Sequence, residues 1–416
     1  MLPNLSVKVS DTTCLEEENM SLGKIRNGGS KSRIFINLSL VFATIIVCMI
    51  GAEIAGRVLY RHRSFGPRPY PYTYHDTLGW LGKPGFNEKL FDWSREGVTY
   101  DMNAWGLRGK LPPLPPNSPG KRRVLFLGDS FLDGLGVETW ERASDLIQEA
   151  DSSLVVYNVS SGGWSTDQEL LALRKFGPAM QPQLILLFFC LNDMPYNESN
   201  YAYGIAKPYY EVGRDSVLRL MNVPVPRRST FASLMMWFRD HSIWGARFFA
   251  FIDYHNVLGE WVLPNPVRHR IGVPGIEQRY PNFDRLLAFA DSYKIGQTTY
   301  FLLRDIAVEC RRLEADLVLF TVPSNSEWTG TRDGSPAEIH RVLAWCRELN
   351  IPTVDLFPVF RDEYLETRSR LFLPDDMHWN AAGNRVVADT VLGVIRTPPA
   401  GMQSISFYSA PESESH

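Results

Sequence analysis

The sequence is poor in cysteine and lacks the spacings that build a metal cluster or a disulfide framework. Its 416 residues include five cysteines, and no two of them are arranged as Cys-x-x-Cys. We therefore expect no structural metal and no set of disulfides. The one pairing that the sequence leaves open is a bridge between Cys310 and Cys346, which both fall on expected helices.

The chain also lacks an excess of charge of either sign. Its 43 lysines and arginines nearly balance 46 aspartates and glutamates, which gives a net charge of −3. Nucleic acid requires a basic surface, so we expect no nucleic-acid partner. Apolar residues make up 44% of the chain, which is ordinary for a globular protein, and the length suggests two or three units.

Several enzyme motifs are missing as well. The Gly-x-Ser-x-Gly elbow of α/β-hydrolases is absent around Ser130, because Leu132 occupies the position of its second glycine. The sequence has no Gly-x-x-x-x-Gly-Lys-Ser/Thr loop, no dinucleotide fingerprint and no His-Glu-x-x-His. It therefore predicts no nucleotide or other cofactor and no catalytic metal.

One long apolar run lies near the N-terminus. Residues 34–52 carry no charge, and as a helix they would reach ~28 Å, close to the ~30 Å thickness of a hydrocarbon layer. We interpret residues 34–56 as a single transmembrane anchor; a buried core helix and a cleaved signal peptide are the alternatives. Basic residues flank the run on both sides. The first-helix convention favours a cytoplasmic N-terminus, with the following domain on the periplasmic, extracytoplasmic side.

The segments around the main domain differ from it in composition. Residues 1–33 are polar and predict a flexible tail, and residues 398–416 predict a disordered C-terminal tail. Residues 57–120 predict a small β-rich extension, because glycine, tryptophan and tyrosine recur there between turn residues. A proline-rich connector, residues 111–120, ends this extension.

Residues 121–397 alternate apolar runs with amphipathic segments. Runs such as VLFLGD and LILLFF are apolar throughout, which is typical of strands that are buried on both faces. Helix-period segments separate them, so we predict an α/β domain with a doubly wound parallel sheet, a three-layer sandwich. The alternation lapses over about residues 194–296, where an aromatic, helical insertion is expected. That insertion would cap the active site, lean on the membrane or pack against its own sheet.

Polar residues follow the strands of this sheet where ligands collect, at the carboxyl ends. Ser130, Gly163 and Asn192 come after the first three strands, and His378 precedes the last helix. Asp375 lies three residues before His378, an offset that in a turn brings both side chains to one side. Alone, each residue would be a helix cap, a turn glycine or an ordinary histidine. Their common placement predicts one site.

Together these residues resemble the four blocks of the SGNH (GDSL-type) hydrolase superfamily. Ser130 matches the nucleophile, Gly163 and Asn192 match the glycine and asparagine, and Asp375 with His378 matches the final Asp-x-x-His. The stretch upstream is similar to lead-in segments of membrane-anchored bacterial members. The sequence departs from the family in two places. Cys190 replaces a frequent glycine of the third block, and Ser160 replaces a frequent glycine of the second block.

The chemistry of these residues predicts a serine nucleophile. His378 would take the Ser130 proton, and Asp375 would orient the imidazole. The oxyanion would bind the amides of Ser130 and Gly163 and the Asn192 carboxamide. Asp129 would act behind them by bonding the surrounding loops, because an uncompensated carboxylate beside an oxyanion opposes catalysis.

We therefore expect a serine esterase that hydrolyses O-acetyl or acyl groups on an envelope carbohydrate or lipid. An O-acyltransferase that moves the acyl group onto an envelope glycan is the first alternative, because it shares the acyl-serine intermediate. A non-catalytic envelope binding module is the second alternative, but its expected sign, loss of the triad, is not seen.

Overall fold

The structure is a computed structural model of the full chain. It describes residues 14–59, 71–90, 97–227, 230–245, 296–325 and 335–397, except residues 116, 118, 203, 204 and 375. The described chain divides into two compact units. One unit holds the N-terminal helix together with Ser242–Trp244, and the other holds the remaining described residues.

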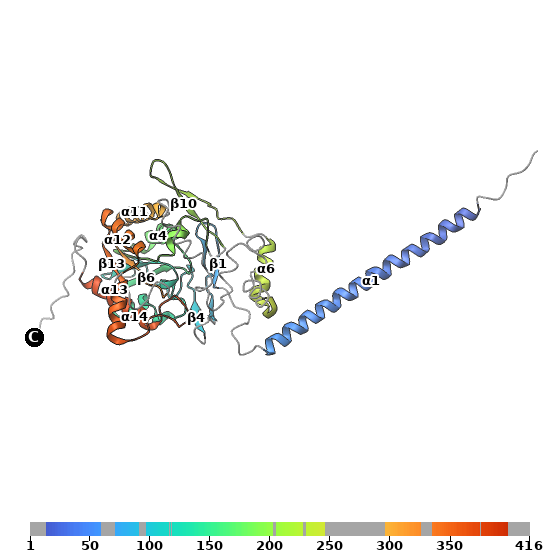
Figure 1. The fold of residues 1–416 in the computed structure, drawn as a ribbon, viewed down its shortest axis with the longest axis horizontal. Helices are drawn as coiled ribbons and strands as arrows, with labels where there is room; N and C mark the ends of the chain where they lie inside the picture. The colour runs from blue at the N-terminus through green and yellow to red at the C-terminus, as the bar shows by residue number, and fades with distance from the viewer. Residues whose placement is uncertain are drawn as a thin grey trace, which may run out of the picture. The chain divides into compact units, whose positions relative to one another are not determined.

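The larger unit is built on a five-stranded parallel sheet (Figure 1). Its strands are β5 (Arg122–Gly128), β6 (Leu154–Ser160), β7 (Leu184–Phe189), β12 (Asp316–Thr321) and β13 (Thr353–Asp355). Their order across the sheet is β13-β12-β7-β5-β6. The chain therefore leaves β5 first toward β6 and then returns to its other side at β7. Ligands bind at such a reversal point, outside the carboxyl ends of the strands.

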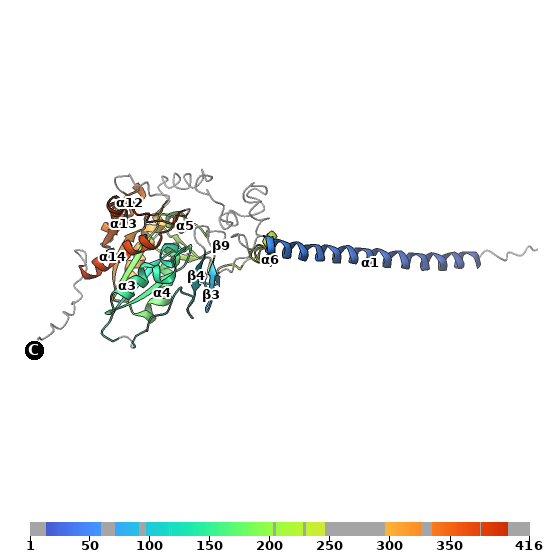
Figure 2. The same cartoon turned by 90° about the horizontal axis from the view of Figure 1, so that it is seen from below.

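Helices cover both faces of this sheet, which confirms the predicted doubly wound fold (Figures 1 and 2). Alternate residues of each strand enter opposite cores: Leu125 of β5 lies in one core and Phe126 in the other. The helices are α3 (Ala143–Ala150), α4 (Thr166–Met180), α11 (Gln297–Arg312), α12 (Ala337–Glu348), α13 (Leu356–Thr367) and α14 (Ala381–Arg396). α4 and α11 pack together over the first core, and α3 and α14 pack together over the second.

The extension folds into short antiparallel pairs. β1 (Tyr72–His75) pairs with β2 (Gly79–Gly82), and β3 (Asn87–Leu90) pairs with β4 (Val98–Asp101). Buried aromatic and apolar side chains of these strands join the same core as α4, so the extension packs on the sheet domain rather than forming a core of its own.

The described part of the insertion begins with hairpins. β8 (Tyr201–Ala202) pairs with β9 (Ile205–Ala206), and β10 (Tyr209–Val212) pairs with β11 (Leu218–Met221). The expected helix follows as α6 (Thr230–His241). The rest of the predicted aromatic stretch, residues 246–295, lies outside the described residues.

The N-terminal helix α1 runs from Cys14 to Leu59, so it includes residues 14–33 of the segment for which the sequence predicts a flexible tail. Good helix formers such as leucine, glutamate, methionine and lysine recur there, and they continue the helix that the apolar run begins. Residues 33–58 are long and apolar enough to cross a membrane, with a mean hydropathy of 2.5, which a signal sequence would also show. Residues 1–13 and 398–416, where tails were predicted, lie outside the described residues.

The bridge left open by the sequence does not form. Cys310 on α11 and Cys346 on α12 are both free, buried thiols. Each faces the apolar core, where burial raises the pKa of the Cys346 thiol to about 12. These cysteines are core residues that act as small apolar side chains.

Candidate active site

Ser130 lies where β5 turns into α2 (Ser130–Asp133). The turn is tight: a Cβ atom on Gly128 would lie 2.9 Å from Cδ1 of Leu132. Asp129 caps the short helix, because its side chain accepts a hydrogen bond of 2.9 Å from the amide of Phe131. Ser130 is therefore held rigidly at the carboxyl end of a central strand, and it is 8% exposed.

The structure brings His378 to this serine, as the sequence predicts. Nε2 of His378 lies 2.7 Å from Oγ of Ser130, although the two residues are 248 positions apart. The amide of Leu373 donates to the His378 carbonyl over 2.9 Å, so the loop before α14 closes on itself around the histidine. The Phe131 ring, 4.6 Å away between ring centroids, packs against the imidazole.

The carboxylate behind the imidazole belongs to Asp376 and not to the predicted Asp375. Oδ1 of Asp376 is hydrogen-bonded to Nδ1 of His378 and also accepts the His378 amide over 2.9 Å. Asp375 itself lies outside the described residues. In this turn an offset of two residues folds the carboxylate back over the backbone of His378.

The charge on Asp376 is strongly stabilised. Burial alone would raise its pKa, but the positive charge of His378 and the hydrogen bonds from that residue lower the pKa to about 2. Asn325, just after β12, donates from Nδ2 to the Asp376 carbonyl over 3.2 Å. The acid is therefore ionised over the whole range in which a histidine can act as a base.

Asn192 and Asp129 connect the loops that follow two neighbouring strands. Asn192 caps α5 (Asp193–Asn197), directly after β7, and its side chain is hydrogen-bonded to Asp129. Burial raises the pKa of Asp129 to about 6, opposed by the Phe131 amide, the charge of His378 and the bond from Asn192. Asp129 thus joins the loops that follow β5 and β7, in agreement with its predicted place behind the site.

Gly163 lies in the turn after β6, the strand beside β5. Its φ angle of 78° is in the left-handed region, where glycine has no steric penalty. Ser160, at the end of β6, donates from Oγ to Oδ1 of Asn158 over 2.6 Å and so points back into the sheet. The replacement of the family's glycine by Ser160 is accommodated inside the strand layer.

Sequence reasoning missed a tyrosine of the extension that joins the two loops. The hydroxyl of Tyr72 donates to the Asp133 carboxylate, which belongs to the serine-bearing helix α2. The same hydroxyl accepts from the amide of Gly162 over 3.2 Å, and Trp80 donates from Nε1 to the Gly162 carbonyl over 2.9 Å. One strand pair of the extension therefore holds the turn that carries Gly163.

Arg108 is a second residue of the extension with this role. Its guanidinium is buried and donates to four carbonyls, three of which belong to the loop after Ser130: Asp133 at 2.9 Å, Gly134 at 2.6 Å, Val137 at 2.8 Å and Thr99 at 2.8 Å. Cζ of Arg108 lies over the ring of Tyr100, 3.7 Å from the ring centroid. The only sequence signal for these contacts was the density of aromatic residues and glycines in residues 70–109.

A buried polar network beneath the strand ends was also missed. Lys207 and Asp167 form an ion pair in which neither side chain is exposed, and Lys207 also donates to the Tyr196 carbonyl over 3.0 Å. Nearby, burial raises the pKa of Glu169 and of Asp193 well above the usual values, and the negative charges around them raise both further. Among the described residues, no group of histidines, cysteines and carboxylates is arranged to hold a metal ion.

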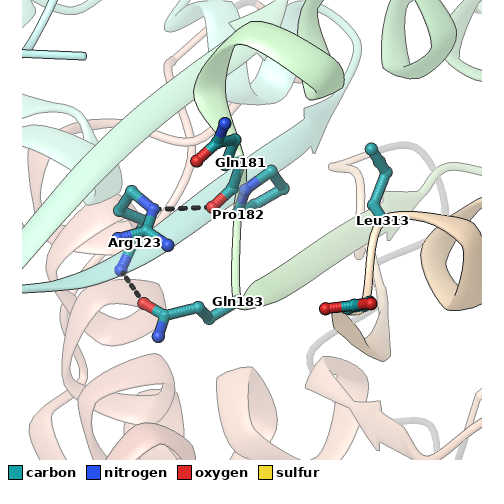
Figure 3. Close-up of a pocket in the computed structure, with 6 residues that line it drawn as sticks. Arg123, Gln181, Pro182, Gln183 and Leu313 are labelled. Atoms are coloured by element: carbon teal, nitrogen blue, oxygen red, sulfur yellow. Dashed lines mark hydrogen bonds between the residues drawn. The ribbon is translucent and has the colours of Figure 1, made fainter. Parts of the chain in front are cut away.

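A surface pocket of about 430 Å³ lies at the opposite, amino-terminal edge of the sheet (Figure 3). Arg123 of β5 closes one side through a 2.6 Å bond from Nε to the Gln181 carbonyl and a 3.0 Å bond from its amide to Gln183. This pocket contains no residue of the serine site, and the helix ends around it provide no nucleophile. The pocket is therefore separate from the site of Ser130 and His378.

Comparison with known proteins finds one family model that is similar to the C-terminal part of this chain. Residues 321–407 match the model of a family described as "SGNH hydrolase-like domain, acetyltransferase AlgX". The matched segment includes His378, which is bonded to Ser130 at the strand ends of the parallel sheet. No curated protein matches the sequence.

Several solved structures are similar in fold at low identity. They include the acetyl xylan esterase AlAXEase (13% identity, 66% of this chain and 99% of that one, TM-score 0.34). The psychrotrophic esterase EstA from Pseudoalteromonas sp. is 12% identical over 66% of this chain and 97% of its own, with a TM-score of 0.34. A lipolytic G-D-S-L protein from Veillonella parvula is 11% identical over 66% and 99%, with a TM-score of 0.35.

Proposed function

We propose that the protein is a serine-dependent esterase that takes an acyl group from a carboxylic ester onto Ser130 and releases it to water. The observation that carries this proposal is the 2.7 Å bond between Ser130 Oγ and His378 Nε2, with Asp376 on the other ring nitrogen. A serine hydroxyl is a weak nucleophile near neutral pH and needs a base within such a distance.

In the proposed reaction, His378 Nε2 accepts the Ser130 proton while Oγ bonds to the ester carbonyl carbon. The tetrahedral oxyanion collapses by breaking the bond to the alcohol oxygen, and this oxygen takes the proton from His378. Water then gives a proton to His378 and attacks the acyl-serine, and Ser130 leaves with that proton. Asp376 holds the ring in place and stabilises the imidazolium in both steps.

The proposed oxyanion donors are the amides of Ser130 and Gly163 and the Asn192 carboxamide. Support comes from their positions after β5, β6 and β7, the three neighbouring strands at the reversal point of the sheet. Loss of one such donor typically costs about 2.7–4 kcal/mol of transition-state stabilisation. Asn192 should therefore matter nearly as much as the residues that move the proton.

Transfer of an acetyl group to a hydroxyl is the second candidate function. The family model that matches residues 321–407 is described as an acetyltransferase, which favours this reading. The first half of the reaction is the same, and the acceptor hydroxyl takes the place of water in the second half. In either case we propose an envelope carbohydrate or lipid ester as the substrate, with α1 as a single-pass anchor and the catalytic domain on the extracytoplasmic side.

Covalent labelling with a fluorophosphonate tests the nucleophile. We expect the full-length protein in detergent to be labelled and Ser130→Ala not to be labelled. Ser153→Ala is the matched control, because Ser153 is an exposed serine at the other edge of the sheet. Equal labelling of Ser130→Ala and the intact protein would refute the proposal.

An acceptor experiment separates the two candidate functions. The protein is incubated with an acetylated glycan and a second, unacetylated glycan of different length, and both are followed by mass spectrometry. Free acetate alone supports the esterase. Acetylated acceptor, dependent on Ser130, would replace it by the transferase.

A further inference from the structure

Helix α6 carries an apolar face that nothing in the described chain covers. Phe231, Leu234 and Trp237 are 71%, 56% and 57% exposed. At 100° per residue these three positions fall within a third of the circumference of the helix. A soluble domain rarely leaves large apolar side chains together on one helix face without a partner for them.

The residues directly after α6 bind the C-terminal part of α1. Ser242 Oγ donates to Glu53 Oε2 over 2.8 Å, and the amide of Ile243 donates to Glu53 Oε1 over 3.1 Å. Trp244 Nε1 donates to the carbonyl of Ala52 over 2.8 Å. These contacts lie within one compact unit of the structure.

Gly56 makes this contact close. It is the one residue of α1 from 33 to 58 that is buried among the described side chains. A Cβ atom there would lie 3.2 Å from Trp244 Nε1 and 3.3 Å from Ile243 Cγ2. The segment Ser242–Trp244 therefore packs closely against α1 at Gly56, where the absence of a side chain leaves room for it.

This contact between Ser242–Trp244 and α1 lies at the end of the apolar span. Ala52, Glu53 and Gly56 fall in the last two turns of the apolar stretch of residues 33–58. If α1 crosses a bilayer, these turns lie where the helix leaves the hydrocarbon. Tryptophan is enriched at that level of membrane proteins, because its indole has an apolar body and a polar N–H.

We propose that residues 230–244 form a membrane-surface segment, in which Phe231, Leu234 and Trp237 of α6 insert among the lipids. The occupant of the apolar face is a phospholipid bilayer. The argument is continuity: α6 ends at His241, and the next three residues are bound to the end of the span. The inference depends on α1 remaining as an anchor, and it is independent of the proposed chemistry.

Spin labelling of the full chain in nanodiscs tests this surface. The background variant is Cys14→Ser, in which Cys48 on α1 is the exposed thiol and reports on the anchor. Single-site probes are then placed at Phe231→Cys and Trp237→Cys, each with Cys48→Ala. Val217→Cys with Cys48→Ala is the matched control, because Val217 is an apolar residue, 51% exposed, on the β10–β11 hairpin.

The measurement is the collision rate of each nitroxide with oxygen, which concentrates in lipid, and with a water-soluble nickel chelate. In nanodiscs of phosphatidylcholine with phosphatidylglycerol, we expect the oxygen-to-nickel ratio at positions 231 and 237 to exceed that at 217 several-fold. If the oxygen-to-nickel ratio at positions 231 and 237 equalled that at 217 while position 48 had the ratio of a residue in lipid, the inference would be wrong. The interpretation of α1 as an anchor would then still hold. Protection from both reagents would also overturn the inference, since a protein would then cover the face. If the oxygen-to-nickel ratio at position 48 were that of a residue in water, both the interpretation of α1 as an anchor and the inference would be wrong.

Discussion

Replacement of Asp376 by asparagine should abolish most of the catalytic rate, whereas the same change at Asp375 should not. Asparagine has nearly the size of aspartate, so Asp376→Asn removes the charge and leaves the loop its side-chain volume. The carboxylate now accepts from both Nδ1 and the amide of His378. An amide in its place offers an N–H to Nδ1, which favours the tautomer whose Nε2 carries the proton and cannot accept another from Ser130.

The size of the loss follows from the electrostatics of the pair. The pKa of Asp376 is lowered from 3.8 to about 2, and the charge of His378 is the largest favourable contribution to that shift. The shift corresponds to about 2 kcal/mol at 1.36 kcal/mol per pKa unit. Because the interaction is reciprocal, the imidazolium would lose a stabilisation of that order. Solvent screening reduces it somewhat, since the Asp376 side chain is 32% exposed.

Loss of charge alone therefore predicts a decrease in kcat of about 30-fold. The change of tautomer adds to this, up to the ~10⁴-fold loss known for the same substitution in a serine protease triad. The assay is steady-state hydrolysis of p-nitrophenyl acetate by the full-length protein, with the rate of fluorophosphonate labelling as a second readout. Thermal unfolding of each variant checks that the fold is intact. If Asp375→Asn lost as much activity as Asp376→Asn, the assignment of the acid would be wrong.

Three further changes probe the buried groups around the site. Tyr72→Phe removes the hydroxyl between Asp133 and the glycine turn, so we expect kcat on p-nitrophenyl acetate to fall while KM changes little, and unfolding free energy to drop by about 1–3 kcal/mol. Lys207→Met leaves the Asp167 carboxylate buried without its cation and should cost about 3–5 kcal/mol in a urea titration. Glu169→Gln should flatten the pH dependence of stability. The pKa of Glu169 in the folded protein lies well above the ordinary value of 4.5, so the intact protein loses stability as pH rises above that value, and the variant should lose less over the same rise.

The controls for these changes come from similar residues in other places. Tyr209→Phe removes a hydroxyl that is bonded only to exposed Glu211, and Lys121→Met removes an exposed cation. Both should be close to neutral. A Tyr72→Phe variant with unchanged kcat would show that the extension does not position the site. A Glu169→Gln variant with the same pH profile as the intact protein would show that Glu169 is ionised when folded.

The sheet was predictable because its strands are buried on both faces. Runs such as residues 184–189 are apolar at every position and become β7, and the polar residues that follow them mark the carboxyl ends. Ser130 and His378 could be placed for that reason, since the edge at which parallel strands end is set by topology alone. The direct contact between them confirms this reasoning at the level of atoms.

The acid could not be chosen from spacing. Asp375 and Asp376 are neighbours, and either can reach an imidazole, depending on the backbone angles of a turn that has no periodic pattern. The three-residue offset in a turn, together with the resemblance to Asp-x-x-His, selected the first. The structure has the second, because its carboxylate also satisfies the backbone amide of His378. Local hydrogen bonding, which sequence periodicity does not report, decided between the two.

The extension shows a second limit of sequence reasoning, since composition alone describes residues 57–120 as a separate piece. A buried guanidinium is costly unless its N–H groups find partners, and Nη1 and Nη2 of Arg108 donate to three carbonyls of the loop after Ser130. The arginine therefore ties the extension to the loop that follows the serine. Tyr72 ties the extension in the same way to the turn of Gly163. The extension is therefore better understood as part of the catalytic unit than as a spacer between the anchor and the sheet.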